Sequence, residues 1–294
     1  VPETMLQTLY ARAKEMCTRG AIRDEKAAAL VERIDYDFSL ADKDAAMHSG
    51  VIARTIVLDR LVEGFLAQHQ SAAVVNLACG LDTRCYRVEG YGRWYNLDLP
   101  ETMAVRAELL PESGKITQLA MSAMDDWSAA VEERDAPALV IIEGLTMYLS
   151  ERDVQRIFEV IAARFPRVTV LVETMSPAVV RRFKEKSIEC SGARFTWGVA
   201  DGAAEALCGL RSPGRLSRSK PVAIRVMRIS SSSDASNAAP KMIVASGCAS
   251  SVIIATAESI SSSPMSGLAV MLTTIPRAPL MFVSSSGLDI AILA

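Results

Sequence analysis

VVNLACGLDTR, residues 74–84, is the stretch that decides the fold predicted for this chain. It begins as a short apolar strand, turns at Gly80 and reaches an acid at Asp82. A strand that ends in a glycine turn is typical of nucleotide-binding α/β proteins. A pyrophosphate cradle, however, uses the pattern G-x-G-x-x-G, and this stretch has a single glycine. The sequence therefore predicts a ligand that the backbone approaches closely but that carries no phosphate.

The residues on both sides of this stretch alternate between predicted strands and predicted helices. Strands are expected at 72–78, 94–100, 115–121, 138–145 and 167–175, and helices at 3–17, 24–34, 51–69, 102–110, 151–165 and 177–188. Asp24 and Ser150 are suited to cap the helices that follow them. This alternation predicts a doubly wound, mostly parallel, Rossmann-like α/β sheet with N-terminal helices, and a ligand at the carboxyl ends of its strands.

Composition divides the chain near residue 208. Residues 1–208 contain 15 of the 16 aromatic residues and 10 serines, whereas residues 209–294 contain one aromatic residue and 19 serines. The net charge changes from −7 in the first part to +5 in the second. We therefore expect a domain over 1–208, made of a helical cap over 1–70 and a sheet core over 71–208, and an atypical serine-rich tail over 209–294.

The tail mixes serine runs with the apolar pieces MIVASGC and SVIIATA. A linker would be polar throughout, and a domain would show regular periodicity. We expect that residues 209–294 are not a native domain, as a reading-frame shift near residue 208 would produce, and that the strand at 167–175 is left as an exposed apolar edge. The alternative is a divergent tail whose two apolar pieces supply replacement strands.

Charge and cysteine content argue against several classes of function. The net charge of −2 and the isoelectric point of about 5.9 give no electrostatic basis for binding nucleic acid. The six cysteines form no C-x-x-C pair and the chain has two histidines, so no metal site is expected. No apolar run approaches the ~20 residues that span a bilayer, and the N-terminus has no signal-peptide core. We expect a cytoplasmic protein.

Acidic residues stand at the ends of four successive predicted strands: Asp82, Asp98, the pair Asp125 and Asp126, and Glu143. Any one of them has a simple explanation as the cap of a following helix. Four together would repel a phosphate-rich ligand. Carboxylates instead accept hydrogen bonds from hydroxyl and amino groups and balance positive charge. S-adenosylmethionine offers a ribose, an adenine amino group and a cationic centre without phosphate, and it is the ligand favoured by this pattern.

Several stretches carry a resemblance to a known family. NLACGLDTRCYR, WYNLDLPE, DDW and IIEGLTMYLSERDV resemble, in order and spacing, the class I S-adenosylmethionine-dependent methyltransferases of the leucine carboxyl methyltransferase and tetracenomycin polyketide synthesis O-methyltransferase group. The likeness spans roughly residues 5–205 and includes FTWGVADG. It implies an enzyme that uses S-adenosyl-L-methionine as its cofactor. It also implies methyl transfer to a carboxylate, hydroxyl or phenol oxygen of a small or polyketide-like molecule.

The resemblance further implies roles for individual residues on the cofactor. Arg54 would hold the methionine carboxylate, Gly80 would lie against the methionyl part, and Asp98 would take the ribose hydroxyls. Asp125, together with Asp126, would contact the adenine amino group.

Three further positions follow from the same resemblance. Glu143 would lie near the amino acid part of the cofactor, and Arg12 or Lys14 would add a second basic contact. Ala78 departs from the family, in which many members have glycine, and we expect its methyl group to weaken cofactor binding.

The catalytic residue stays open in the sequence. A carboxylate acceptor is already ionised, whereas a hydroxyl or phenol can need a general base. His48, expected in a charged loop, and His69, expected at a helix end, both have ordinary structural explanations. Tyr148 is a weak candidate for the acceptor pocket and is equally compatible with packing. No catalytic base is therefore predicted.

Two other classes of protein share part of this pattern. A nicotinamide-dependent oxidoreductase would share the strand–helix alternation and an acid in the position of Asp98, but it should have G-x-G-x-x-G. A catalytically impaired S-adenosylmethionine-binding protein that has lost its acceptor site would keep every cofactor motif. The identity of the acceptor and the oligomeric state cannot be predicted from the sequence.

Overall fold

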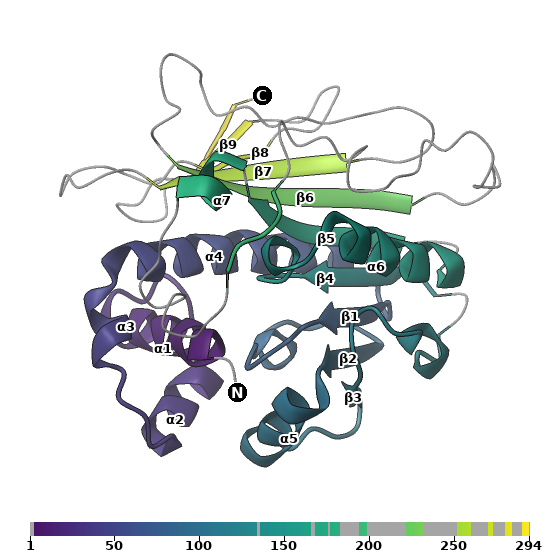
Figure 1. Ribbon diagram of the computed structural model, residues 1–294, viewed down its shortest axis with the longest axis horizontal. Helices are drawn as coiled ribbons and strands as arrows, with labels where there is room; N and C mark the ends of the chain where they lie inside the picture. The colour runs from purple at the N-terminus through teal and green to yellow at the C-terminus, as the bar shows by residue number, and fades with distance from the viewer. Residues whose placement is uncertain are drawn as a thin grey trace. The chain divides into compact units, whose positions relative to one another are not determined.

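The computed structural model describes residues 3–133, 136–165, 168–175, 177–182, 194–198, 222–231, 252–259, 270–272, 280–283 and 290–293 (Figure 1). The chain forms two compact units, Val1–Val131 with Lys184–Arg194 and Glu132–Phe183 with Phe195–Ala294. The domain boundary expected near residue 208 lies outside the described residues.

Helices open the first unit: α1 (Glu3–Thr18), α2 (Glu25–Arg33), α3 (Ser39–Lys43) and α4 (Ala45–Gln68). α1 packs against the other three helices (Figure 1). Met5, Leu9 and Ala13 recur every four residues along α1, so they share one face of the helix, and they pack with Ala27 and Leu30 of α2. This apolar contact holds the N-terminal helices together.

Two helix starts bear on the sequence predictions. Asp24 caps α2 as expected, since its side chain accepts a hydrogen bond from the N–H of Ala27. α4 begins at Ala45 rather than at residue 51, because Asp44 caps it by accepting from the N–H of Met47. The expectation that His48 lies in a loop is therefore wrong, since this residue is in the first turn of α4.

A parallel sheet completes the first unit. β1 (Ala73–Leu77), β2 (Arg93–Asp98) and β3 (Ile116–Ala120) run side by side, with Leu77 opposite Leu97 and Asp98 opposite Ala120. α5 (Pro100–Leu109) connects β2 to β3 and packs on both strands. The short 3-10 helices η1 (Arg84–Tyr86) and η2 (Trp127–Ala130) follow β1 and β3.

The second unit continues the alternation. Its elements are β4 (Ala138–Ile142), η3 (Thr146–Tyr148), α6 (Glu151–Arg164), β5 (Val168–Met175), α7 (Pro177–Arg182), β6 (Val222–Ser231), β7 (Val252–Ser259), β8 (Val270–Leu272), β9 (Leu280–Val283) and β10 (Ile290–Leu293). β4, β5, β6 and β7 pair in parallel in that order, and β7 to β10 pair antiparallel. Parallel strands joined through helices in both units make a Rossmann-like α/β fold, which confirms the predicted fold class.

The tail contributes a strand next to β5, which differs from the sequence prediction. β5 pairs with β6 along its whole length, from Val168 opposite Val222 to Met175 opposite Ile229. The prediction that β5 is a bare edge is therefore wrong. The apolar piece SVIIATA falls largely within β7, whereas MIVASGC lies outside the described residues. That residues 209–294 are not a native domain stays a prediction.

Across the part of the chain that the structure describes, no helix is both long enough and apolar enough to cross a membrane.

Candidate functional site

The turn after β1 has an unusual backbone. Ala78 has φ of +52° and Gly80 has φ of +47°. Glycine adopts this left-handed region at little cost, whereas the Cβ of an alanine meets the following carbonyl there. The departure noted at Ala78 thus strains the backbone of the turn itself. α1 covers the turn closely, since a Cβ added at Gly80 would lie 3.3 Å from the Cβ of Met5.

Asp98, at the end of β2, closes this turn. The N–H of Gly80 donates to Oδ2 of Asp98 at 2.8 Å, and the N–H of Leu99 donates to Oδ1 at 2.8 Å. Burial raises the pKa of Asp98 above its ordinary value, and the two N–H bonds offset this only in part. Each carboxylate oxygen accepts one of these bonds and has capacity for another. The side chain is fixed in direction and still able to bind donors.

The loop after β3 lies next to Asp98, because the N–H of Met121 donates to the backbone carbonyl of Asp98 at 2.9 Å. Within this loop the carboxylate of Asp125 accepts from the N–H of Ser122 at 3.0 Å. Asp125 and Asp126 are both exposed. The first unit therefore brings the glycine turn, Asp98 and the aspartate pair to one edge of its sheet, as the sequence predicted.

The basic residues expected at the site have different surroundings. Arg54 is half-buried on α4. Arg12 is buried, and its guanidinium donates to Asp24 at 2.9 Å and to the carbonyl of Leu81 at 2.9 Å, so it supports the backbone of the glycine turn. Lys14 forms an ion pair with Asp42 at 2.8 Å.

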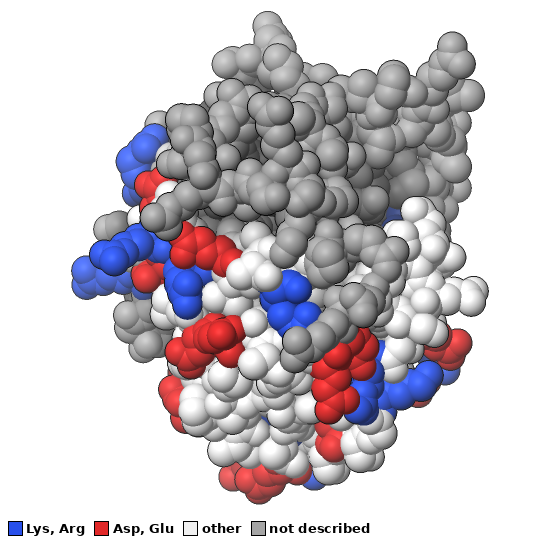
Figure 2. Space-filling model, turned by 90° about the vertical axis from the view of Figure 1, so that its right-hand side faces the viewer, with Lys and Arg blue, Asp and Glu red and all other residues white. Residues whose placement is uncertain are grey.

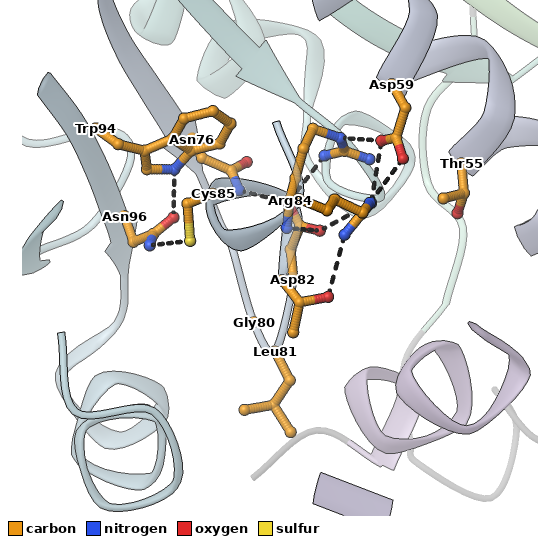
Figure 3. A network of polar contacts seen from close by, with 12 residues as sticks. Thr55, Asp59, Asn76, Gly80, Leu81, Asp82, Arg84, Cys85, Trp94 and Asn96 are labelled. Carbon is orange, nitrogen blue, oxygen red and sulfur yellow. Dashed lines mark hydrogen bonds and ion pairs between the residues drawn. The ribbon is translucent and has the colours of Figure 1, made fainter. Parts of the chain in front are cut away.

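Sequence reasoning missed how the segment 82–87 is used. Asp82, one of the acids expected to face the ligand, accepts from Nη1 of Arg84 at 2.8 Å and from Nδ2 of Asn76 at 2.9 Å (Figure 3). Burial alone would raise the pKa of Asp82, but Arg84, Arg87 and Arg12 outweigh it and hold this pKa well below the usual range. Asp82 is therefore a structural anion. Charged residues spaced as D-T-R-x-x-R were the signal for it.

The segment 82–87 belongs to a largely buried set of ion pairs. We call this set the Arg/Asp cluster: Arg12, Asp24, Asp59, Asp82, Arg84 and Arg87. Its three arginines and three aspartates balance in charge, which offsets the cost of removing them from water. The cluster joins the glycine turn to α1, to the cap of α2 and to α4.

Arg106 of α5 braces the same turn from another side. Its Nη1 donates to the carbonyls of Gly80 and Asp82, both at 2.8 Å, and its Nη2 donates to Glu112. The side chain is fully buried. A buried guanidinium that spans two carbonyls of one turn restricts the conformations that the turn can adopt.

Glu143 lies in the second unit, directly after β4, and is half-buried. The next residue, Gly144, has φ of +66° and donates its N–H to Oε2 of Glu173 at 2.6 Å. Glu173 is fully buried on β5. The turn that carries Glu143 is thus held by a buried carboxylate that sequence reasoning did not single out.

Tyr148 is half-buried in η3. Its ring centroid lies 5.3 Å from that of Phe195. The N–H of Thr196 donates to the carbonyl of Met147 at 2.7 Å, so the described start of FTWGVADG packs directly on η3.

His69 has the structural surroundings that were expected of it, whereas His48 is buried in a helix instead of solvated in a loop. His48 is buried, and its Nε2 lies 2.9 Å from Oε2 of Glu15, which joins α4 to α1. Burial acts to raise the pKa of Glu15, but hydrogen bonds from Arg19 and His48 bring it below the ordinary value. His69 is the C-terminal cap of α4, and its ring centroid lies 4.6 Å from that of Phe65 at an interplanar angle of 47°.

Comparison with known proteins now adds the family. The family described as leucine carboxyl methyltransferase matches residues 5–162. The chain is 36% identical over 209 residues to the tetracenomycin polyketide synthesis O-methyltransferase TcmP of Streptomyces glaucescens, which covers 68% of this chain and 76% of that relative. It is 31% identical over 224 residues to the S-adenosyl-L-methionine-dependent methyltransferase dpfgK of Gibberella zeae, covering 68% and 75%.

A solved structure of an O-methyltransferase family protein from Burkholderia thailandensis aligns with 65% of this chain and 62% of its own, at 12% identity and a TM-score of 0.36. The family match covers more than half of the chain and contains the glycine turn, Asp98 and the aspartate pair. The chain belongs to the leucine carboxyl methyltransferase family and is an S-adenosylmethionine-dependent methyltransferase.

Proposed function

We propose that this enzyme transfers the methyl group of S-adenosylmethionine to an oxygen atom of a small, polyketide-like molecule, either a carboxylate or a hydroxyl or phenol. The name of the relative from Streptomyces glaucescens supports this class of acceptor. On the face shown in Figure 2, the described Lys and Arg side chains lie among Asp and Glu side chains, which favours a small acceptor over nucleic acid.

The observation that carries the proposal is the contact between Gly80 and Asp98. The N–H of Gly80 aims the carboxylate of Asp98 while leaving acceptor capacity on both of its oxygens. Two adjacent ribose hydroxyls are suitable donors for such a carboxylate. Phosphate would be repelled by Asp98 and the nearby aspartate pair, so these acceptor groups fit S-adenosylmethionine better than NAD.

The adenine is assigned to the loop after β3. Leu99 and Met124 are two of the large apolar side chains exposed in the described part of the chain, at 45% and 36%. Leu99 directly follows Asp98 in the sequence, and Met124 directly precedes Asp125. Each of the two loops therefore carries an exposed apolar side chain next to a carboxylate. An adenine ring needs apolar contact on its faces and an acceptor for its amino group. Asp125, with Asp126, is our candidate for that acceptor.

The methionine part is assigned to Arg54 of α4, and the role expected for Glu143 stays a prediction. A guanidinium pairs well with the methionine carboxylate, and a carboxylate pairs with its ammonium group. The bound cofactor supplies an electrophilic methyl group on a sulfonium. The chain binds and orients the reactants, because in-line displacement depends mainly on their alignment. An acceptor that is already ionised would need no general base.

The cofactor assignment is tested by substitution. Asp98→Ala and Arg54→Ala should each weaken binding of S-adenosylhomocysteine at least tenfold, because losing a charged hydrogen-bond partner costs about 1.5–3 kcal/mol. Titration calorimetry measures the affinity, and Glu108→Ala, an exposed carboxylate of α5, is the matched control. Tight NAD binding without any response to S-adenosylhomocysteine would refute the proposal.

The acceptor assignment needs a separate experiment. Labelled S-adenosylmethionine is incubated with panels of small carboxylic acids and of phenols, and labelled product is counted. Product from either panel supports O-methyl transfer and decides between the two acceptor types. Binding of S-adenosylhomocysteine with no product from either panel would contradict the proposed acceptor class.

A further inference from the structure

Asp59 lies where α4 meets the segment after the glycine turn (Figure 3). Its Oδ1 accepts from Nε of Arg84 at 2.6 Å, and its Oδ2 accepts from Nε of Arg87 at 2.6 Å. Nη2 of Arg87 donates to Oδ1 as well, at 3.0 Å. A single carboxylate on α4 therefore holds two guanidinium groups, both from the segment that follows the turn.

The contacts continue from Arg84 to the sheet. Nη1 of Arg84 donates to Asp82, and Asp82 accepts from Asn76 of β1. An unbroken series of hydrogen bonds thus runs from Asp59 of α4 through Arg84 and Asp82 to Asn76. Asn76 precedes the glycine turn in the sequence, and Asp82 and Arg84 follow it. The side chain of Arg84 is 1% exposed, so the middle of this series is protected from water.

α4 also carries Arg54, five positions before Asp59. At ~1.5 Å per residue the two side chains start about 7.5 Å apart along one helix axis. Because a helix moves as a rigid rod over such a distance, a change in how Asp59 docks would move Arg54 by a similar amount. Arg54 and Gly80, by contrast, come from elements that are far apart in sequence.

We propose that Asp59 is a positioning residue of the cofactor site, which sets the separation between Arg54 on α4 and Gly80 in the turn. It thereby controls affinity for the amino acid part of the cofactor. This inference rests on the proposed assignment of Arg54 and Gly80 to that part. The adenosine part is assigned to Asp98 and Asp125, which are held by β2 and β3 rather than by α4.

The test compares two probes that differ in the amino acid part. S-adenosylhomocysteine has it, and 5′-methylthioadenosine lacks it. Asp59→Asn should weaken the binding of S-adenosylhomocysteine by about tenfold, since a hydrogen bond to a charged group that is pulled out of alignment loses free energy of this order. The affinity for 5′-methylthioadenosine should stay unchanged. Calorimetry on the full chain gives both dissociation constants, and circular dichroism confirms that the variant is folded.

Two controls isolate the position of α4. Glu63→Gln removes an exposed carboxylate from the same helix and should leave both affinities unchanged. Asp24→Asn removes another aspartate of the Arg/Asp cluster, at the cap of α2 instead of on α4. It should lower thermal stability without changing the ratio of the two affinities. If Asp59→Asn does not fold, Asp59→Glu keeps the charge and displaces it by one methylene, and the same selective loss is expected.

The outcomes separate this inference from the proposed function. Absence of S-adenosylhomocysteine binding in the unaltered protein overturns the proposed cofactor site and the inference together. If the unaltered protein binds both probes and the Asp59 variants match it, the role of Asp59 is overturned and the cofactor site stands. If Asp59→Asn weakens the binding of both probes equally, or if Asp24→Asn changes the ratio of the two affinities as much as Asp59→Asn does, the effect is a general loosening of the structure. Either result also overturns the role of Asp59.

Discussion

Ala78 places a methyl group where φ is +52°, and we predict that Ala78→Gly stabilises the protein. Relief of left-handed strain is worth roughly 1–2 kcal/mol, and the greater freedom of glycine in the unfolded chain removes about 0.4–1 kcal/mol of it. A net gain of about 0.5–1 kcal/mol in the free energy of unfolding should appear in urea denaturation. Ala67→Gly, on an exposed face of α4, should have the opposite sign. Destabilisation by both variants would rule out strain at Ala78.

Asp98 gives the site a pH dependence. Its pKa lies above the ordinary value of 3.8, so on acidification it takes up a proton at higher pH than a free aspartate does. Protonation removes acceptor capacity from the group assigned to the ribose. Affinity for S-adenosylhomocysteine should therefore fall as pH decreases, by up to about tenfold per pH unit below that pKa. Calorimetry across the acid range should find the decline beginning above pH 3.8, and Asp98→Asn should bind weakly with a flatter profile. An identical profile in the variant would assign the titration to another group.

Among the elements, α6 owes its start to a capping box. Ser150 accepts from the N–H of Asp153 at 3.2 Å, and Asp153 accepts from the N–H of Ser150 at 3.3 Å. Ser150→Ala should cost about 1 kcal/mol of unfolding free energy, which corresponds to roughly 2–4 °C in melting temperature. Ser113→Ala, in an exposed loop, serves as the comparison and should leave the melting temperature unchanged. A Ser150 variant as stable as this control would mean that packing alone sets the start of α6.

The elements also show how far the sequence could be interpreted. β1 and β4 were predicted to within a few residues because every residue in them is buried, and all of these residues except Asn76 are apolar. The start of α4 was missed because AAMHSG has little apolar periodicity and depends on the cap at Asp44. α3 and the 3-10 helices were missed because they are too short for a periodic signal.

At the site, the same distinction holds. The positions of Asp98 and Asp125 could be predicted because parallel strands deliver their ends to one edge, whereas their roles on the cofactor stay predictions. The structural role of Asp82 could not be predicted from its neighbours alone. A carboxylate beside a glycine turn can bind a ligand or form an ion pair. Arg84, which pairs with Asp82, also pairs with Asp59, and Asp59 lies 25 residues away in the sequence. Glu173 was hidden for a similar reason, since it meets Gly144 only through the pairing of β5 with β4.

For the molecule as a whole, the pairing of β5 with β6 makes the tail matter to solubility. A chain that ends at residue 208 would expose the apolar β5 as a free edge, and such edges recruit other chains. We expect this truncation to aggregate, as measured by light scattering and size-exclusion chromatography. A chain that ends at residue 287 loses β10 alone among the described elements and should behave like the full chain. A 208-residue chain that stays monomeric would show that β6 does not protect β5.

The balanced charges of the Arg/Asp cluster limit which substitutions at its six positions can occur in related proteins. Replacing one member leaves a buried partner unmatched, at a cost of about 3–5 kcal/mol, against a total stability of ~5–15 kcal/mol for a typical domain. The six positions, which run from Arg12 to Arg87, should therefore be kept or lost together in descent. Recombination between a relative that keeps the cluster and one that has lost it follows the same rule. A crossover between residues 59 and 82 would separate Asp24 and Asp59 from Arg84 and Arg87, so viable hybrids should join before residue 12 or beyond residue 87.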